Sequence, residues 1–351
     1  MRKWLLHIFY IAMLGMLAVS CSNVNMDEPL PAKENVQLSF TLAVGENVAG
    51  ARSTWGEGYT PNTIGDSYDN KINPDELQVL LYTTENEYVG KVENLLYIQR
   101  SDNLNVYDFI GDLSASLTIG NSYKIMVFAN CGNNVTEQTD LKEMRFQYDT
   151  SAIPMWGVIT KNLQLVPGQR RDLGTIDLLR AMAKVEVTLT DEVYKNFDLT
   201  GVTLNKYNSN GYCLPKEHAT ANTTGSIKLD ECYRIPQDAG YSTNLNLEKI
   251  QKENKAYICY VPEIMNEDGS LAIAVTLTDK KGKLIKLNNN QLFFMNYQDG
   301  NKLDDTQYNV VRNHYYRFDI TKVSTTEATI SLDFLALPWE EEVRINVPEF
   351  N

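Results

Sequence analysis

The stretch Val36-Gln37-Leu38-Ser39-Phe40-Thr41-Leu42-Ala43-Val44 carries apolar side chains at every second position. A period of two places alternate side chains on opposite faces of a β-strand. The sequence therefore predicts a nine-residue strand with one buried face. The buried side chains would be those of Val36, Leu38, Phe40, Leu42 and Val44.

The segment after this strand is unusually long for a loop. Residues Gly45 to Asn73 are rich in Gly, Thr and Asn. Connections within compact domains are mostly about 4–6 residues long, and loops beyond about 12–15 residues are uncommon. A regular strand tethered by so long a loop is predicted to be separable from the domain on which it packs.

Short strands bounded by Gly, Asn, Asp or Pro recur through the first half of the chain. They are predicted at Leu77–Tyr82, Tyr88–Val92, Val106–Ile110, Leu117–Ile119, Tyr123–Asn130 and Leu163–Val166. Turn signals about 8–12 residues apart are typical of a β-sandwich, and no alternation of strands and helices is visible. One short helix is predicted at Thr136–Phe146.

A seam between two domains is predicted at Ile176–Leu189, where an apolar run continues as an alternating strand. Later strands are predicted at Thr200–Leu204, Ala256–Val261, Leu271–Thr278, Leu284–Leu287 and His314–Ile320. The turns Asn266–Gly269 and Asp279–Gly282 indicate hairpins. The last alternating segments, Ala328–Leu337 and Glu342–Val347, mean that the chain ends as it begins, in strands.

The composition agrees with a folded, strand-rich protein. The 351 residues are 43% hydrophobic and 10% aromatic, with 20 Tyr but only three His. Aromatic residues suit half-buried sheets, whereas scarce His removes the commonest general base and metal ligand. The net charge of −13 argues against nucleic acid as a partner.

The N-terminus carries a secretion signal. Residues 1 to 20 begin with Arg2 and Lys3 and continue as an apolar stretch. Leu17-Ala18-Val19-Ser20-Cys21 resembles the lipobox of bacterial lipoproteins, which predicts lipidation of Cys21 and a lipid anchor in a membrane. The alternative is an ordinary secretory signal in which Cys21 has no special role. Residues 22–34 are polar and would form a tether.

The remaining cysteines are interpreted as small buried side chains rather than a metal site. They are Cys131, Cys213, Cys232 and Cys259. Their spacing is not that of a zinc site. An oxidising compartment would permit a bond between Cys213 and Cys232, but each cysteine lies beside strand-like residues, so the free form is preferred.

No pattern of residues indicates catalysis. The chain lacks the nucleophile, zinc, phosphate-loop and EF-hand motifs of common enzyme families. Past the signal, His218 lies in a polar loop and His314 in a strand, so each is interpreted as a surface or packed residue. No catalytic residue, metal or cofactor is predicted, although a lipoprotein enzyme acting on carbohydrate stays open, because paired carboxylates cannot be found from sequence alone.

Several stretches together resemble the Bacteroidales fimbrillin family, the lipoprotein pilins of Bacteroides and Porphyromonas. The resemblance rests on the lipobox at Cys21 and on four further stretches that follow in the same order along the chain. These are Tyr123-Lys124-Ile125-Met126-Val127-Phe128-Ala129-Asn130, Ile153-Pro154-Met155-Trp156-Gly157, Leu178-Leu179-Arg180-Ala181-Met182-Ala183-Lys184-Val185-Glu186-Val187 and Arg312-Asn313-His314-Tyr315-Tyr316-Arg317.

The resemblance implies an all-β fold of two tandem transthyretin-like β-sandwich domains. It also implies export to the cell surface as an outer-membrane lipoprotein, removal of the first strand by an arginine-specific protease, and polymerisation by donor-strand exchange. The implied division is a signal peptide (1–20), a lipidated propeptide with the first strand (21–52), two domains (53–177 and 178–327) and a C-terminal strand tail (328–351). The implied partners are other fimbrial subunits.

The sequence contains residues that match each part of this scheme. Arg52 is the one arginine between Cys21 and Arg100, so cleavage between Arg52 and Ser53 would release the lipid together with the first strand. The donor strand would present Ile330, Leu332, Phe334, Val343, Ile345 and Val347. The alternative is that both terminal strands belong to their own domains, as a tip or anchor subunit would require.

Two readings from other classes stay open beside a shaft or stalk subunit of a fimbria. The first is a tip or anchor subunit that keeps its lipid. The second is a surface lipoprotein that binds glycans through exposed aromatic residues such as Trp55, Tyr59 and Tyr68. A ligand on a host or bacterial surface is left unassigned.

Overall fold

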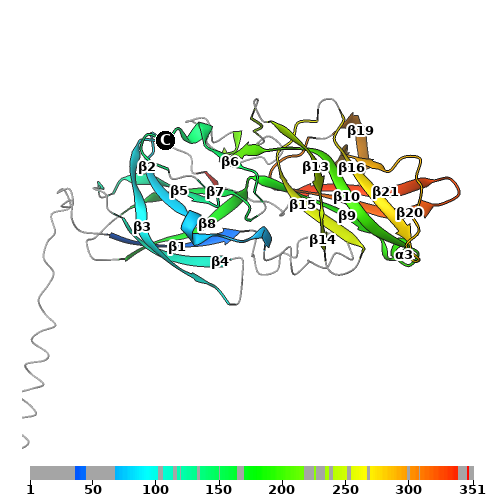
Figure 1. Ribbon diagram of the computed structural model, residues 1–351. Coiled ribbons are helices and arrows are strands. Elements are labelled where there is room, and N and C mark those ends of the chain that lie inside the picture. Colours follow the sequence, from blue (N-terminus) through cyan, green and yellow to red (C-terminus); the bar gives the residue numbers. More distant parts are fainter. Residues whose placement is uncertain are drawn as a thin grey trace, which may run out of the picture.

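The protein is seen here in a computed structural model. It describes residues 36–44, 68–101, 106–113, 117–118, 120–132, 135–149, 151–163, 170–216, 225–226, 234–236, 240–250, 254–266, 269–298, 301–307, 309–338 and 346–347. These residues form two strand-rich halves, joined where one long strand leads into the next (Figure 1). The fold is all-β, as predicted.

The first half is a closed barrel of seven strands in the order β1-β4-β3-β2-β5-β7-β8. Their bounds are β1 Val36–Val44, β2 Gln78–Thr83, β3 Tyr88–Gln99, β4 Val106–Leu113, β5 Ser122–Ala129, β7 Met155–Asn162 and β8 Arg170–Arg180. Alternating apolar side chains of these strands point inward, so the barrel interior is a packed core.

The second half contains two larger sheets, one of four strands in the order β13-β10-β16-β17 and one of five in the order β14-β15-β9-β20-β21. The bounds are β9 Met182–Leu189, β10 Phe197–Asn208, β13 Tyr241–Asn246, β14 Glu248–Ile250, β15 Ala256–Pro262, β16 Ala272–Asp279, β17 Gln291–Phe293, β20 His314–Ser324 and β21 Thr329–Pro338. Apolar residues from both sheets share one core, so these sheets pack face to face.

Shorter elements connect or decorate the two halves. They are the 3₁₀ turns η1 Pro74–Glu76 and η2 Leu141–Glu143, the helix α3 Asp191–Tyr194, and the strands β6 Arg145–Gln147, β11 Asn210–Tyr212, β12 Gly225–Ser226, β18 Met295–Gln298, β19 Asn301–Gln307 and β22 Asn346–Val347. The last of these, β22, pairs with β12.

Two hydrophobic cores meet near the predicted seam. Met182 packs in the core of the first half and Ala183 in the core of the second. Ala181 separates β8 from β9, and its amide donates to the carbonyl oxygen of Pro154 at 2.8 Å. The chain therefore crosses from one core to the other within β8 and β9.

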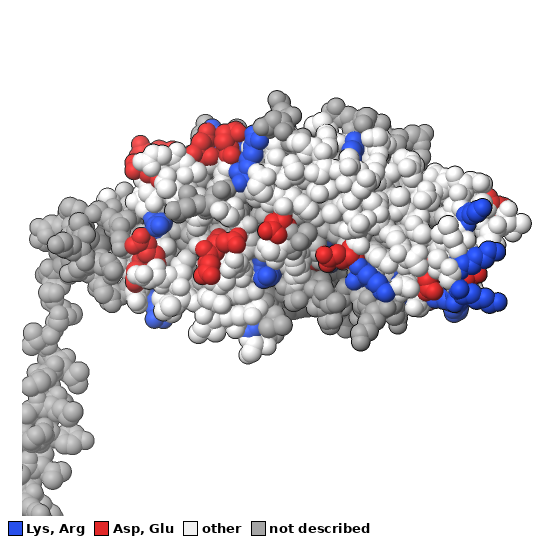
Figure 2. Space-filling view, viewed as in Figure 1, with Lys and Arg blue, Asp and Glu red and all other residues white. Residues whose placement is uncertain are grey.

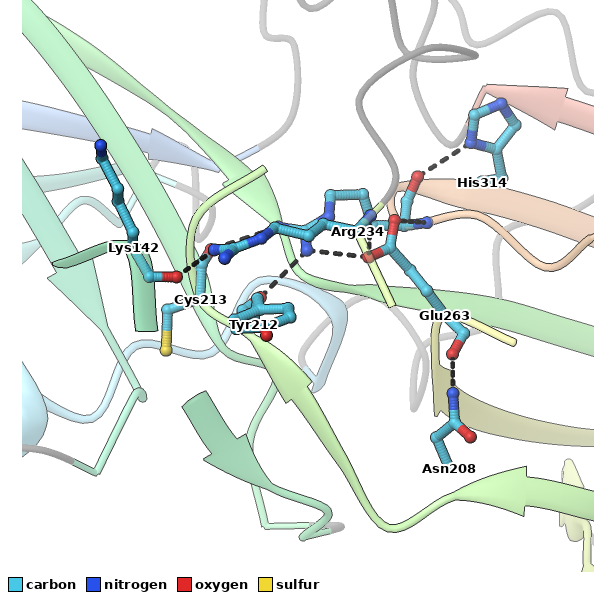
Figure 3. A network of polar contacts seen from close by, with 8 residues as sticks. Lys142, Asn208, Tyr212, Cys213, Arg234, Glu263 and His314 are labelled. Carbon is cyan, nitrogen blue, oxygen red and sulfur yellow. Dashed lines mark hydrogen bonds and ion pairs between the residues drawn. The ribbon is translucent and has the colours of Figure 1, made fainter. Parts of the chain in front are cut away.

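Strand pairing and buried ions also join the halves. Gly211 of β11, in the second half of the chain, pairs with Phe146 of β6 in the first. Beside this pair Arg312 is fully buried, and its guanidinium lies 2.8 Å from Glu263 and 3.2 Å from the carbonyl oxygen of Cys213. Figure 3 shows Glu263 and Cys213 in this network of polar contacts. A buried ion pair of this kind needs further hydrogen bonds, which the Cys213 carbonyl helps to supply.

The helix predicted at Thr136–Phe146 is wrong. The structure has the 3₁₀ turn η2 there, followed by β6. The side chain of Asp140 caps the turn by accepting from the amide of Lys142, and Phe146 is then drawn into the strand pair with β11. Tertiary pairing has overridden local helix propensity.

Three predicted strands are also not formed as expected. Leu117 and Thr118 are not in a strand, and the amide of Thr118 instead donates to the hydroxyl of Tyr123. Leu163, where a strand to Val166 was expected, follows the end of β7 and is not in a strand, and residues 164–166 lie outside the described residues. Leu284 forms an isolated bridge to Thr278 rather than a strand. Each is a short segment for which sequence periodicity carries little information.

Candidate functional site

Strand β1 lies between two strands that are far from it in sequence. It pairs antiparallel with β4, from Val36↔Leu113 to Ala43↔Val106, and parallel with β8, from Gln37↔Arg170 to Val44↔Leu178. We call the facing edges of β4 and β8, with the core side chains beneath them, the β1 slot. Because both edges of β1 are paired, it completes the barrel (Figure 1).

The inward face of β1 is fully buried. The side chains of Val36, Leu38, Phe40 and Leu42 are each at most 3% exposed. Burying an apolar side chain contributes roughly 1.5–3 kcal/mol, so these residues hold β1 in place by on the order of 10 kcal/mol before ordering costs. Their alternation confirms the buried face predicted from the sequence, and the β1 slot without β1 would expose an apolar floor.

An aromatic stack runs across three neighbouring strands at the middle of β1. The ring of Phe40 stacks on Phe109 of β4 with centroids 5.4 Å apart, and Tyr97 of β3 stacks on the same ring at 5.8 Å. Aromatic pairs across strands add about 0.5–1.5 kcal/mol beyond their buried area. Phe40 therefore fixes the register of β1 against β4.

A polar contact marks the outer face of the same pair of strands. The hydroxyl of Thr41 donates to Asp108 of β4 at 2.7 Å, and Arg100 pairs with the same carboxylate at 2.7 Å. The Arg100 hydrogen bond is the main cause that holds the pKa of Asp108 below its ordinary value. Because Asp108 and Arg100 are both more than two-fifths exposed, solvent screens this pair.

The other side of the β1 slot, β8, ends at a buried arginine. The guanidinium of Arg180 donates to the carbonyl oxygen of Asp69 at 2.8 Å, to the side chain of Asn70, and to Asn313 at 3.3 Å. Asn313 belongs to the second half of the chain. Arg180 thus joins the end of β8 to both halves.

Asp69 is also held by side chains of the second half. Its carboxylate pairs with Lys184 of β9 at 2.6 Å and accepts from the hydroxyl of Tyr260 of β15. The Asp69 and Lys184 side chains are only 7% and 4% exposed, so both charges are desolvated and depend on each other. The turn at Tyr68–Asn70 is therefore fixed at the junction between the two halves. In sequence it follows residues 45–67, whereas β1 precedes them.

Several of the predicted site residues are not described by the structure, or are described only in part. Cys21, Arg52, Ser53, Val343 and Ile345 lie outside the described residues. Val44 and Val347 are described by their backbone alone, Val44 within β1 and Val347 in β22 opposite Gly225.

The first part of the predicted donor strand lies in a sheet of its own domain. Ile330, Leu332 and Phe334 belong to β21, which pairs with β20 from Thr329 to Pro338. Phe334 is buried in the second core, and the other two pack against it. This is the arrangement of the alternative in which the strand is native to its own domain.

Other predicted residues are packed rather than exposed. Tyr68 was expected to be an exposed aromatic, but it is half-buried and its ring lies 4.6 Å from that of Tyr260. Burial raises the pKa of Tyr68. This corrects its proposed role in glycan binding; Trp55 and Tyr59 lie outside the described residues. His314 is buried, as the packed interpretation predicted.

The described cysteines are free thiols. Cys131, Cys213 and Cys259 are all buried, while Cys232 and His218 lie outside the described residues. The thiol of Cys131 interacts with Cys213, which together with burial raises the pKa of Cys131. Within the part of the chain that the structure describes, no group of His, Cys, Asp and Glu could hold a metal ion. Among the same residues, no helix is long and apolar enough to cross a membrane.

The sequence did not reveal the cluster formed by Asp69, Arg180 and Lys184. One signal was present, because Arg180 interrupts the apolar run Leu178-Leu179-Arg180-Ala181-Met182, and a charge in such a run needs a partner if it is buried. The identity of that partner could not be inferred, since Asp69 is 111 residues away from Arg180.

Comparison with known families identifies the chain. Residues 75–344, more than half of the chain, match the model of the fimbrillin-A associated anchor proteins Mfa1 and Mfa2. The chain belongs to this family. The resemblance to fimbrillins is thereby confirmed at the level of the family, which consists of fimbrial and adhesion proteins rather than enzymes. The matched region begins after β1.

Solved structures share the fold. The tip fimbrial protein Mfa3 from Porphyromonas gingivalis, with a C-terminal truncation, has a TM-score of 0.52 at 14% identity, covering 87% of this chain and 100% of that one. A putative cell adhesion protein from Parabacteroides distasonis has a TM-score of 0.50 at 15% identity, covering 88% and 98%. At these identities the likeness concerns the fold. No curated protein matches the chain.

Proposed function

We propose that this protein is a surface fimbrial subunit in which β1 is exchanged for a strand of a neighbouring subunit. The observation that carries the proposal is the position of β1. It is paired on both edges and buried on one face, yet it is joined to the rest of the barrel only through the long segment 45–67. A strand held in this way can be replaced by another strand of the same pattern without rebuilding the barrel.

The proposed processing steps fit this position. Lipidation at Cys21 would tether the precursor to the outer membrane, since each buried methylene of an acyl chain contributes about 0.8 kcal/mol. Cleavage between Arg52 and Ser53 would release the lipid and β1 as one fragment, because both precede the cut. The Tyr68–Asn70 turn follows the cut and would stay on the body, where Lys184 and Tyr260 hold Asp69.

We place the donor segment after Pro338. Because Ile330, Leu332 and Phe334 are part of β21, a donor that left the subunit with them would strip an edge strand from its own core. Val343, Ile345 and Val347 alternate in the same way and lie beyond that strand. Val347 is in the two-residue strand β22 opposite Gly225 of β12, a short pairing that the donor would give up. Three buried side chains would contribute roughly 5–9 kcal/mol before ordering costs, and main-chain pairing would add register.

The domain division is part of the same proposal. We assign residues 53–177 to the domain that offers the β1 slot and residues 178–327 to the second domain, with 328–351 as the C-terminal strand tail. The separation of the two hydrophobic cores at Met182 and Ala183 supports a boundary near this point. Within this tail we take only the residues after Pro338 as free to leave the subunit, because β21 packs on the second core.

An anchor subunit is the second candidate. It is favoured by the description of the matching family as anchor proteins and by β1 being in place in the described fold. An anchor would keep Cys21 and its lipid, because the β1 slot would never need to be emptied. The shaft, stalk, tip and anchor roles differ in this one step.

N-terminal sequencing of the surface form decides between the two. Ser53 as the first residue supports the exchanged subunit, and a blocked, lipidated Cys21 supports the anchor. An Arg52→Ala variant is the matched control, since it should retain Cys21 in either case. Heating the trimmed protein without full denaturation should give a ladder of strand-linked oligomers on a gel. Trimmed protein that stays monomeric at every concentration would exclude exchange.

A further inference from the structure

One neighbour of β1 is firmly tied to the rest of the barrel. Strand β4 pairs with β3 on its far edge from Val92↔Leu113 to Gln99↔Tyr107. Side-chain hydrogen bonds reinforce this pairing near both of its ends. They join Asn94 to Asp112 at 3.1 Å, Arg100 to Asp108 at 2.7 Å and Gln99 to Tyr107 at 3.1 Å. Loss of β1 would leave β4 with its β3 ladder intact.

The other neighbour of β1, strand β8, is paired with the rest of the barrel at one end only, among the described strands. Strand β8 pairs with β1 over Arg170–Leu178. In the described part of the chain its far edge pairs with β7 at two positions only, Trp156↔Leu179 and Met155↔Arg180. Most of the β8 ladder therefore depends on β1, and loss of β1 would leave Arg170–Leu178 without a paired edge among the described strands.

The tied end of β8 is the place where the two halves of the molecule meet. Arg180 is 1% exposed and bonds Asp69, Asn70 and Asn313. The amide of Asn313 donates to Met182 at 2.9 Å, which carries the connection into β9. A buried guanidinium with several hydrogen-bond partners holds its surroundings in place, because breaking any of these hydrogen bonds would leave a buried charge or polar group unsatisfied.

We infer that β8 is the side of the β1 slot that moves during strand exchange, and that it pivots at Arg180, the positioning residue that keeps the pivot attached to both halves. The inference rests on the proposed function. When β1 leaves, β4 stays on β3, while Arg170–Leu178 can swing away from the barrel and return to pair with an incoming strand. Arg180 ensures that the swing stops at the junction and does not unzip β9.

Native-state hydrogen exchange of the full chain, followed by mass spectrometry, tests the moving side without any cleavage. Amides of β1 and of Arg170–Leu178 should exchange through one shared opening, and β4 should exchange with β3. Phe40→Ala should speed β1 and Arg170–Leu178 by the same factor, at least about tenfold, and change β3 by less than about twofold. Gln37→Ala, on the exposed face, is the control. An accelerated β4 with a protected β8 would overturn the inference.

The role of Arg180 as the pivot is tested by the residue at which fast amide hydrogen exchange ends. This position is measured separately from the overall stability of the protein. In the natural chain the fast region should end at Leu179. In Arg180→Met it should extend beyond Ala181 into β9, and Arg180→Lys should restore part of the boundary. If Arg180→Met does not fold, Asn70→Ala removes one partner of the guanidinium and should shift the boundary less. A boundary that stays at Leu179 in these variants would show that Arg180 is not the pivot.

Hydrogen exchange of the full chain and gels of the trimmed protein together separate this inference from the proposed function. If the trimmed protein forms ladders but the amides of β8 exchange as slowly as those of β5, polymerisation by strand exchange is supported and the movement of β8 is rejected. Coupled exchange of β1 and β8 without any ladder would instead reject polymerisation and leave the β8 opening as a property of the barrel.

Discussion

The ring of Phe40 lies nearly parallel to that of Phe109, with planes 9° apart and centroids 5.4 Å apart, and so joins the first strand of the chain to β4. Both rings are buried. The contact spans 69 residues of sequence, from β1 across residues 45–67 and the β2–β3 hairpin. Phe40 therefore contributes both its buried area and its ring stacking to the retention of β1.

Replacing Phe40 by Ala should loosen β1 selectively. Deleting a buried phenyl ring costs about 3–5 kcal/mol in a packed core. We expect most of this loss to appear as faster release of the fragment 21–52 after cleavage between Arg52 and Ser53, because the remaining barrel keeps its own pairs. Release is measured by size-exclusion chromatography of the cleaved protein. Gln37→Ala, at an exposed position of the same strand, should release the fragment at the natural rate. Equal rates for the two variants would contradict the role of Phe40.

A glycine in β7 sets the distance between β7 and β8. A Cβ atom added at Gly157 would lie 2.4 Å from the carbonyl oxygen of Asp177, which is backbone and cannot rotate away. Gly157→Ala should therefore push β8 outward and destabilise the barrel by about 1–3 kcal/mol. Gly201→Ala in β10 is the control, since its added Cβ would meet Thr276 at an ordinary 3.4 Å. Urea unfolding measures the stability of both variants. A Gly157→Ala protein as stable as the Gly201→Ala control would disprove the close approach of β7 and β8 at Gly157.

The buried pair of Asp69 and Lys184 should behave as a unit. Removing one partner of a buried ion pair costs about 3–5 kcal/mol because the other charge stays uncompensated. Asp69→Asn and Lys184→Met should each destabilise the protein, and the double variant should be more stable than the sum of the two losses predicts. A double-mutant cycle from urea unfolding gives this coupling. Additive losses would mean that the two side chains do not interact in solution.

Glu186 should impose a pH dependence on stability. Burial raises its pKa above the ordinary value, and a hydrogen bond from Tyr315 at 2.7 Å opposes this only in part. A carboxyl group whose pKa is raised by folding contributes to the stability of the folded state. This contribution is complete below the unfolded-state pKa of about 4.3 and is lost as the pH rises through the folded-state pKa. Glu186→Gln keeps an acceptor for Tyr315 but cannot titrate. The difference in unfolding free energy between the variant and the natural chain should therefore shift in favour of the variant as pH rises. A difference that is constant from pH 4 to 8 would contradict the assignment.

The sequence predicted local features better than the contacts that make the site. The buried face of β1 followed from its period of two, and the point where the chain crosses between the cores lies within the predicted seam. The neighbours of β1 could not be predicted, because β4 and β8 are distant in sequence and strand pairing depends on global topology. The expected helix at Thr136–Phe146 failed for the same reason, since β6 is stabilised by β11.

The junction residues show a second limit of sequence reasoning. Lys184 stands in an alternating strand, where a charged residue is usually interpreted as solvent-facing, and yet it is buried against Asp69. With 45 carboxylates in the chain, no pattern indicates which of them meets Lys184. The partner becomes visible only when β9 and the Tyr68–Asn70 turn are placed side by side in the fold.

Two deletions of the C-terminus should have different consequences. Removing residues 339–351 takes away the two-residue pairing of β22 with β12 but leaves β21 paired with β20, so the fold of the subunit should be kept while its ability to donate a strand is lost. Removing 328–351 also takes Phe334 from its contacts with Phe318 and Phe294, with ring centroids 4.5 Å and 6.2 Å away, and exposes the edge of β20. We expect the short deletion to melt like the natural chain and the long deletion to melt several degrees lower, because loss of a buried Phe alone costs about 3–5 kcal/mol.

Thermal unfolding followed by circular dichroism measures the melting temperatures of the two deletions, and gels of trimmed, partly heated samples should show no ladder for either deletion. A ladder from the short deletion would move the donor segment back into β21, and an unchanged melting temperature for the long deletion would show that β21 is not part of its own domain.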